Sequence, residues 1–414
     1  MSFLTERIYN NTAIAECFSD TALVGSMVQV EAALARAQET VDMVPKGLGE
    51  AVAGVKIAGD TLAEGIAQAG VPVPALLAEM RAALDPEAAD WLHYGATSQD
   101  ILDTAMVLRA RDALDGLEAK LGDVIGALND VATSNLGIPM LGRTRGQLAT
   151  PISFALRVGS WASPLIALEA ELPALRQSAL RLQMGGSSGS LSTMAPHGAA
   201  ICAAMAMELQ LANTPPWHAD RGPFLAMASW LTRLVTALAK MGRDVAISSR
   251  GEVAELRAGT GGGSSTMPHK SNPVTAEALQ SAHPVAIACQ NGLSSAAIHA
   301  EERDGASWAV EWKLLPELFE ITGSALAHAQ TLAETMAPNA AAMRARIDRT
   351  PDVMAEAAVF ALAASMGRQA ASAAVKEAMA NGTSLSELSA DIPDADMLAD
   401  IADKAAIRVF ERRK

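Results

Sequence analysis

One stretch of the sequence combines a flexible backbone with groups that could bind an anion and move a proton: Gly261-Gly-Gly-Ser-Ser-Thr-Met-Pro-His-Lys-Ser-Asn-Pro273. Three consecutive glycines allow positive φ angles and a loop that closes over a ligand, whereas Asn272 and Pro273 suit the N-cap and first residue of a helix. A helix N-terminus binds anions. With the hydroxyl of Ser264 and the ammonium of Lys270, the stretch predicts a loop that holds a carboxylate beside a proton-transfer group. The alternative is a Gly/Ser linker, which has no need for the Met-Pro-His-Lys run or the Asn-Pro pair.

A second polar stretch, His93-Tyr-Gly-Ala-Thr-Ser-Gln-Asp100, lies at the start of a long helical pattern. Thr97 and Ser98 followed by Asp100 form a helix-capping arrangement, which is by itself a structural feature. The same arrangement leaves N–H donors and two hydroxyls directed at an anion. His93 taken alone is more often a structural histidine than a catalytic one.

Arginine occurs in two further short stretches. Gly142-Arg-Thr-Arg-Gly-Gln147 is predicted to lie in a turn between helices, where Arg143 and Arg145 form either a solvated charge patch or a pair of fork donors for a multiply charged carboxylate. Arg303 follows a predicted helix end, and the simplest interpretation is a surface ion pair. Trp308, shortly after it, favours a shaped turn over a plain charged face.

Long helices must position these residues. Apolar residues from Val107 to Val131 recur in heptad steps and predict a very long helix that ends before Gly137. Such helices cannot bury their apolar stripes singly, so an elongated bundle is expected, with enough apolar surface left for other subunits. Pro164 and Pro173 should kink or interrupt the second long helix. The other predicted long helices span about 151–182, 223–248, 273–299 and 308–336.

The predicted fold class is all-α, with three parts. Residues 1–98 form a small helical domain whose first long helix is capped at Phe18-Ser-Asp20, and residues 99–337 form the central bundle. Residues 338–414 form shorter helices separated by turn residues. No strand pattern is long enough to predict a substantial sheet.

Composition restricts the partners of the chain. Half of the 414 residues are hydrophobic, and a net charge of −14 argues against nucleic acid and anionic membranes. The three cysteines are far apart and form no CxxC pair, which argues against a zinc cluster or a disulfide framework and favours a reducing compartment. Neither a signal peptide nor a membrane span is evident. We therefore expect a cytoplasmic protein.

The stretches His93 to Asp100, Gly142 to Gln147 and Gly263 to Pro273 resemble, in this order, the three shared regions of the fumarase/aspartase superfamily. The resemblance implies a homotetramer whose central helices form a twenty-helix core, with each active site assembled from three subunits. It also implies chemistry without a cofactor or metal. A proton next to a carboxylate is removed and a group on the neighbouring carbon leaves, or the reverse occurs.

Two branches of the superfamily resemble the chain. Adenylosuccinate lyases carry a histidine after Gly-Arg-Thr, where this sequence has Arg145. The 3-carboxy-cis,cis-muconate cycloisomerases tolerate the loss of that histidine and resemble the chain at Gly95 to Asp100 and at Gly305 to Trp308. The cycloisomerase branch is favoured, with a small tricarboxylate as substrate. An adenylosuccinate lyase-like C–N lyase and a non-catalytic helical scaffold remain alternatives.

The resemblance also implies roles for individual residues. Ser264 is the loop hydroxyl that serves as base in related lyases, and Lys270 is the proton donor favoured for the cycloisomerase branch. Asn272, Thr144, Gln147 and Arg303 are assigned to substrate carboxylates. The full set of expected substrate-binding residues is His93, Thr97, Ser98, Arg143, Thr144, Arg145, Gln147, Asn272, Arg303 and Trp308.

Overall fold

The computed structural model describes residues 3–57, 59, 62–259, 262–263, 266–267 and 270–413. Two compact units are formed, each from three separate stretches of chain. The first unit contains residues 1–119, 171–233 and 284–324, and the second contains 120–170, 234–283 and 325–414. The predicted division at residues 98 and 337 follows the order of the chain instead, and it stays a prediction.

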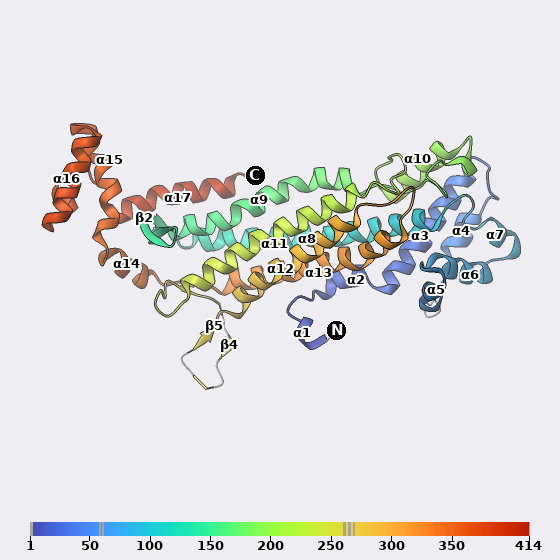
Figure 1. The fold of residues 1–414 in the computed structure, drawn as a ribbon, viewed down its shortest axis with the longest axis horizontal. Helices are drawn as coiled ribbons and strands as arrows, with labels where there is room; N and C mark the ends of the chain where they lie inside the picture. Colours follow the sequence, from blue (N-terminus) through green and yellow to red (C-terminus); the bar gives the residue numbers. More distant parts are fainter. Residues whose placement is uncertain are drawn as a thin grey trace. The chain divides into compact units, whose positions relative to one another are not determined.

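Five long helices contribute residues to both units, and all five predicted long helices are confirmed (Figure 1). The second of them is continuous through Pro164 and Pro173, so the predicted interruption does not occur. Burial of its apolar side chains, Leu165 and Leu172 among them, offsets the hydrogen bonds that the two prolines remove. The five are α8 (Ser98–Thr133), α9 (Phe154–Ala179), α11 (Gly222–Ser248), α12 (Val274–Ala296) and α13 (Gly305–Thr335).

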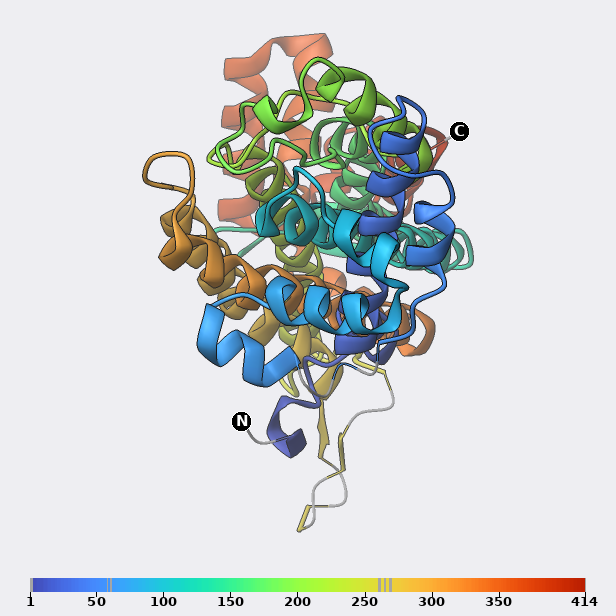
Figure 2. The same ribbon diagram turned by 90° about the vertical axis from the view of Figure 1, so that its right-hand side faces the viewer.

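The first unit begins with short helices and one longer one (Figure 2). As predicted, Ser19 caps α3, because its Oγ accepts a hydrogen bond from the N–H of Ala22 at 3.2 Å. Residues 99–110 of α8 are all buried, so this end of the helix lies in the core of the unit. The remaining elements are α1 (Phe3–Glu6), α2 (Thr12–Cys17), α3 (Asp20–Glu39), α4 (Leu48–Ala53), α5 (Leu62–Ala69), α6 (Val73–Ala83), α7 (Pro86–Trp91), η1 (Ser192–Met194) and α10 (Gly198–Leu209).

The second unit contains the strands of the described residues, in three two-stranded antiparallel sheets. The largest pairs β1 with β2, and α14 and α17 pack on it. Buried alanines, Leu362 and Val375 hold α15 against α16. The elements are β1 (Pro139–Thr144), β2 (Gln147–Ser153), β3 (Leu256–Arg257), β4 (Gly262–Gly263), β5 (Ser271–Asn272), β6 (Ala337–Pro338), α14 (Ala340–Asp348), η2 (Pro351–Met354), α15 (Ala355–Met366), α16 (Arg368–Asn381), η3 (Leu385–Glu387) and α17 (Ala395–Glu411).

Two local predictions need correction. The stretch from Gly142 to Gln147 is not a turn between helices but the tip of the β1–β2 hairpin. Asn272 is not an N-cap, because it pairs with Gly262 in a strand, and α12 begins at Val274 with the carbonyl of Pro273 accepting its first hydrogen bond.

Among the residues that the structure describes, one helix, α11, is long and apolar enough to cross a membrane by length and composition alone. Most of its apolar window, 61%, is buried within the structure. That burial is what a core helix of a globular protein shows.

Candidate active site

The start of α8 is fixed by Asp100, whose side chain is fully buried. Its Oδ2 accepts a hydrogen bond from the backbone N–H of Thr97 at 3.0 Å, which confirms the predicted capping arrangement. Ser98 is the first helical residue. Thr97 and Ser98 are half-buried, and the helix dipole at this end favours an anion.

Asp100 also holds a glycine-rich loop against the helix start. It accepts hydrogen bonds from the N–H groups of Gly185 at 2.8 Å and Gly186 at 2.9 Å, and its Oδ1 lies 2.9 Å from Nε2 of His218. A Cβ on Gly185 would lie 2.8 Å from the Cα of Gly189, so only glycine fits there. The sequence showed this loop only as a run of Gly and Ser, and no local pattern indicated His218.

Arg303, one of the predicted site residues, lies in the same region. Its Nε donates to Oε1 of Gln99 and its Nη2 donates to the carbonyl of Ser187, both at 3.0 Å. The first unit therefore brings together the α8 start, the glycine-rich loop and one guanidinium. Arg303 is an exposed residue, and a guanidinium can bind a carboxylate.

His93 lies just before this region with a left-handed backbone, φ +66°. Its Nδ1 lies 2.6 Å from Oε1 of Glu31, a fully buried carboxylate. Burial opposes the charged imidazole, but the charge and hydrogen bond of Glu31 outweigh burial and raise the pKa of His93 above its ordinary value. One ring nitrogen of His93 is thus used by Glu31, which holds the imidazole beside the α8 start.

Trp308 is almost wholly buried, with 2% of its surface exposed. Its ring N–H donates to Oδ1 of Asp103 at 2.8 Å, so its polar group is already used inside the protein. The indole therefore presents little surface to a substrate in this structure, and it contributes by fixing Asp103.

A buried ion-pair network lies behind these residues, and the sequence analysis missed it. Arg221 donates to both oxygens of Asp103, at 2.7 and 3.2 Å, and to both oxygens of Glu311, at 2.9 and 2.5 Å. All three side chains are at most 2% exposed. Charged residues within an apolar helical pattern, such as Asp103, are the signal that could have identified it.

The network is electrostatically unusual at Glu311. Burial raises the pKa of Glu311 to about 7, although Arg221 acts in the opposite direction. For Arg221, burial disfavours the charge, but its two acidic partners outweigh it and raise the pKa further. Glu311 is therefore poised to gain or lose a proton near neutrality.

In the second unit, the predicted residues of the hairpin are exposed except for Arg143. Arg143 is held by a bidentate ion pair with the buried Glu255, at 2.7 and 2.8 Å. Arg145 and Gly146 form a two-residue turn with positive φ at both positions, 51° and 80°, which suits a hairpin. Thr144, Arg145 and Gln147 project at this tip.

Two more arginines surround Glu255. The Nε of Arg346 lies 3.1 Å from Oε1 of Glu255. Arg157 is close enough for the charges of Arg143 and Glu255 to shift its pKa. Burial lowers the pKa of Arg157 and Arg143 acts in the same direction, whereas the charges of Asp244 and Glu255 act in the opposite direction. The base of the hairpin therefore carries more positive than negative charge around Glu255, and the sequence analysis did not include Arg157 or Arg346.

The glycine-rich stretch forms a short hairpin in which Gly262 and Gly263 pair with Asn272 and Ser271 (Figure 1). A Cβ on Gly262 would lie 2.6 Å from a methyl group of Val274, so the pairing needs glycine. Lys270 is exposed, and Asn272 is half-buried. Ser264 lies outside the described residues.

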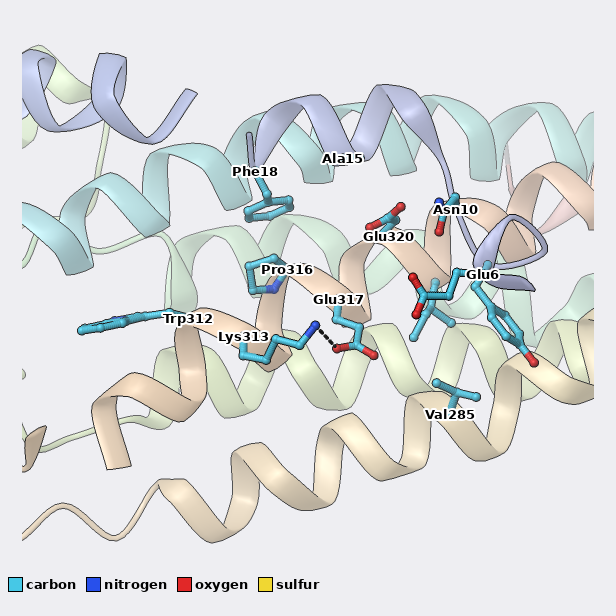
Figure 3. A pocket seen from close by; sticks show the side chains of 12 residues that line it. Glu6, Asn10, Ala15, Phe18, Val285, Trp312, Lys313, Pro316, Glu317 and Glu320 are labelled. Atoms are coloured by element: carbon cyan, nitrogen blue, oxygen red, sulfur yellow. Dashed lines mark ion pairs between the residues drawn. The ribbon is translucent and has the colours of Figure 1, made fainter. Parts of the chain in front are cut away.

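A separate cavity of about 470 Å³ lies in the first unit between the chain start, α12 and α13 (Figure 3). Glu6, Glu317 and Glu320 line it, with Lys313 paired to Glu317 at 3.0 Å. This lining is net negative, so it would repel a polycarboxylate. Within the described part of the chain, no group of three His, Cys, Asp or Glu side chains is placed to hold a metal ion.

Known proteins resemble the chain along its whole length. The sequence profile of a family described as "Lyase" matches residues 4–286. The 3-carboxy-cis,cis-muconate cycloisomerase of Pseudomonas putida is 36% identical over 383 residues, which cover 89% of this chain and 90% of that protein. Nitrosuccinate lyase of Streptomyces davaonensis is 32% identical, with 95% and 88% covered.

A solved structure shows the same fold. The crystal structure of the 3-carboxy-cis,cis-muconate lactonizing enzyme from Pseudomonas putida superposes with a TM-score of 0.90 and 32% identity, covering 100% of this chain and 99% of that one. The predicted all-α fold and the predicted resemblance are confirmed. The chain belongs to the fumarase/aspartase superfamily of lyases.

Proposed function

We propose that the protein interconverts 3-carboxy-cis,cis-muconate and 4-carboxymuconolactone. The observation that carries the proposal is the near full-length likeness to a cycloisomerase in both sequence and structure. The position after Gly-Arg-Thr supports it, because Arg145 replaces the histidine expected of an adenylosuccinate lyase.

Charge complementarity agrees with a tricarboxylate. The chain is acidic overall, yet both groups of site residues offer donors for anions, namely the Arg303 guanidinium beside the α8 start and the exposed Arg145 and Lys270. Arginine forks bind carboxylates in a bidentate manner. Three substrate carboxylates could thus be held by fixed positive charge rather than by a metal.

In the lactonising direction, a carboxylate oxygen attacks the diene and the displaced electron pair moves onto the conjugated second carboxylate, which gives an enediolate-like intermediate. A proton then adds to the carbon beside that carboxylate and removes the extra charge. Fixed cations that stabilise the intermediate should supply the largest share of catalysis. We assign the proton donation to Lys270 and leave Ser264 as the second candidate for proton transfer. Arg143 is committed to Glu255, so its expected role becomes support of the hairpin.

The assembly is part of the proposal. The superfamily resemblance supports a cytoplasmic homotetramer in which each active site takes residues from several copies, acting in the protocatechuate branch of aromatic degradation. Under this proposal the Arg303 region of one copy works with the hairpin and Lys270 of others.

Ultraviolet absorbance tests the proposal. Purified protein should remove the conjugated-diene absorbance of 3-carboxy-cis,cis-muconate as the lactone forms. A C–N lyase is the second candidate, favoured by the likeness to nitrosuccinate lyase. Turnover of adenylosuccinate or nitrosuccinate without diene loss would establish that second function instead, and inactivity toward all three would favour the non-catalytic scaffold.

A further inference from the structure

His299 is a buried side chain in the first unit whose situation the proposed chemistry does not explain. It lies in the segment 297–304, between α12 and α13, and its side chain has no exposed surface. Both of its ring nitrogens are buried, and neither has a hydrogen-bond partner among the described residues. A buried imidazole in this situation has lost its hydrogen bonds to water without forming new ones, which lowers the free energy of unfolding. A partner in the substrate-bound state would remove this cost.

The nearest candidate partner is Glu311. Nε2 of His299 lies 3.6 Å from Oε1 of Glu311, beyond a normal hydrogen bond. A shift of roughly half an ångström would close the contact. Glu311 can accept it, because Arg221 occupies only part of the acceptor capacity of the carboxylate.

Charge balance favours the same contact. Asp103 and Glu311 bring two negative charges into the buried network, and Arg221 supplies one positive charge. One proton shared by His299 and Glu311 would neutralise the excess. Burial, and then Arg221, lowers the pKa of His299, while Asp103 and Asp304 act in the opposite direction, and burial raises the pKa of Glu311 to about 7.

A hydrogen-bonded turn connects His299 to Arg303. Asp304 accepts hydrogen bonds from the N–H of Ala300 at 3.3 Å and from those of Ala306 and Ser307 at 3.0 Å, so the turn is braced on both sides. Arg303 lies within this braced turn.

We propose that His299 is a positioning residue, which docks segment 297–304 on Glu311 and thereby sets Arg303 for its substrate carboxylate. This inference rests on the proposed function for its substrate. His299 itself contacts no reacting atom under this assignment. Under this proposal, the Arg303 guanidinium that His299 positions binds one carboxylate of the tricarboxylate substrate.

The test compares His299→Phe, which keeps a flat ring but has no nitrogen, with His299→Gln, which keeps a donor. His299→Phe should raise KM for 3-carboxy-cis,cis-muconate about tenfold with a smaller change in kcat, and His299→Gln should restore most of the loss. In an Arg303→Lys background, whose raised KM can still be measured, His299→Phe should add little, because both changes act through one guanidinium. His283→Phe serves as the matched control.

Hydrogen exchange supplies a readout that needs no activity. Peptides covering residues 297–304 should exchange faster in His299→Phe than in wild type and His299→Gln. Unchanged exchange together with unchanged KM in His299→Phe would overturn the proposal, as would a further tenfold rise in KM in the Arg303→Lys background. If wild type proves inactive toward the tricarboxylate, the proposed function fails while the exchange result still decides whether His299 docks the segment.

Discussion

The residues predicted for the site fall into two groups, one held by contacts within the folded chain and one exposed. In the first unit, Arg303 and the start of α8 are connected to a buried network through Gln99, Asp100 and Asp103. In the second unit, Arg145 and Lys270 are exposed. The first group is oriented by folding itself, whereas the second must be oriented by substrate or by another copy of the chain.

If the exposed group performs the chemistry, its loss should reduce activity without affecting folding. Lys270→Ala should lower kcat by about three orders of magnitude or more, because it removes the proposed proton donor. Steady-state kinetics and circular dichroism measure both properties. Lys376→Ala, an exposed lysine on α16, is the control, and full activity of Lys270→Ala would remove Lys270 from its role.

If the buried network of Asp103, Arg221 and Glu311 is structural, removing its cation should lower the free energy of unfolding. Arg221→Met leaves Asp103 and Glu311 without their shared cation and should lower the free energy of unfolding by about 3–5 kcal/mol. Urea denaturation measures the loss. The exposed pair of Arg233 with Glu171 is the comparison, because Arg233→Ala should cost less than about 1 kcal/mol. Equal losses in the two variants would contradict the assignment.

Arg303 belongs to the first group because of its contacts with Gln99 and Ser187. Like the exposed second group, it is also proposed to contact the substrate. Arg303→Lys keeps the charge but cannot make two hydrogen bonds in one plane, so KM should rise about 10- to 100-fold while the protein stays folded. Kinetics at several substrate concentrations measure this change. A wild-type KM would show that Arg303 binds no substrate carboxylate.

The last expected effect concerns pH. Glu311 has a pKa raised from 4.5 to about 7, so the folded protein holds an extra proton in that range. The free energy of unfolding should therefore fall as pH rises from 4.5 to 7, by at most about 1.4 kcal/mol per pH unit. Glu311→Gln should remove this part of the slope, and Glu356→Gln, an exposed control, should not. Identical slopes in wild type and Glu311→Gln would contradict it.

The long helices were predictable because apolar spacing alone specifies them, and the capping at Ser19 and Asp100 is local in sequence. The network of Asp103, Arg221 and Glu311 was not, since its members are far apart in the chain and no local pattern pairs them. The pairing of Arg143 with Glu255 was not predictable either, because these two residues are also far apart in the chain. The errors at Gly142 to Gln147 and at Asn272 arose where short strand pairing replaced the expected helix ends.

The central claim is that the two groups act as one site contributed by different copies of the chain. Mixing inactive Lys270→Ala with inactive Arg303→Ala, after reversible dissociation, measures it directly. The account predicts that hybrid assemblies regain about a quarter of the wild-type activity, because some sites receive both intact residues. A mixture as inactive as its two components would contradict the claim.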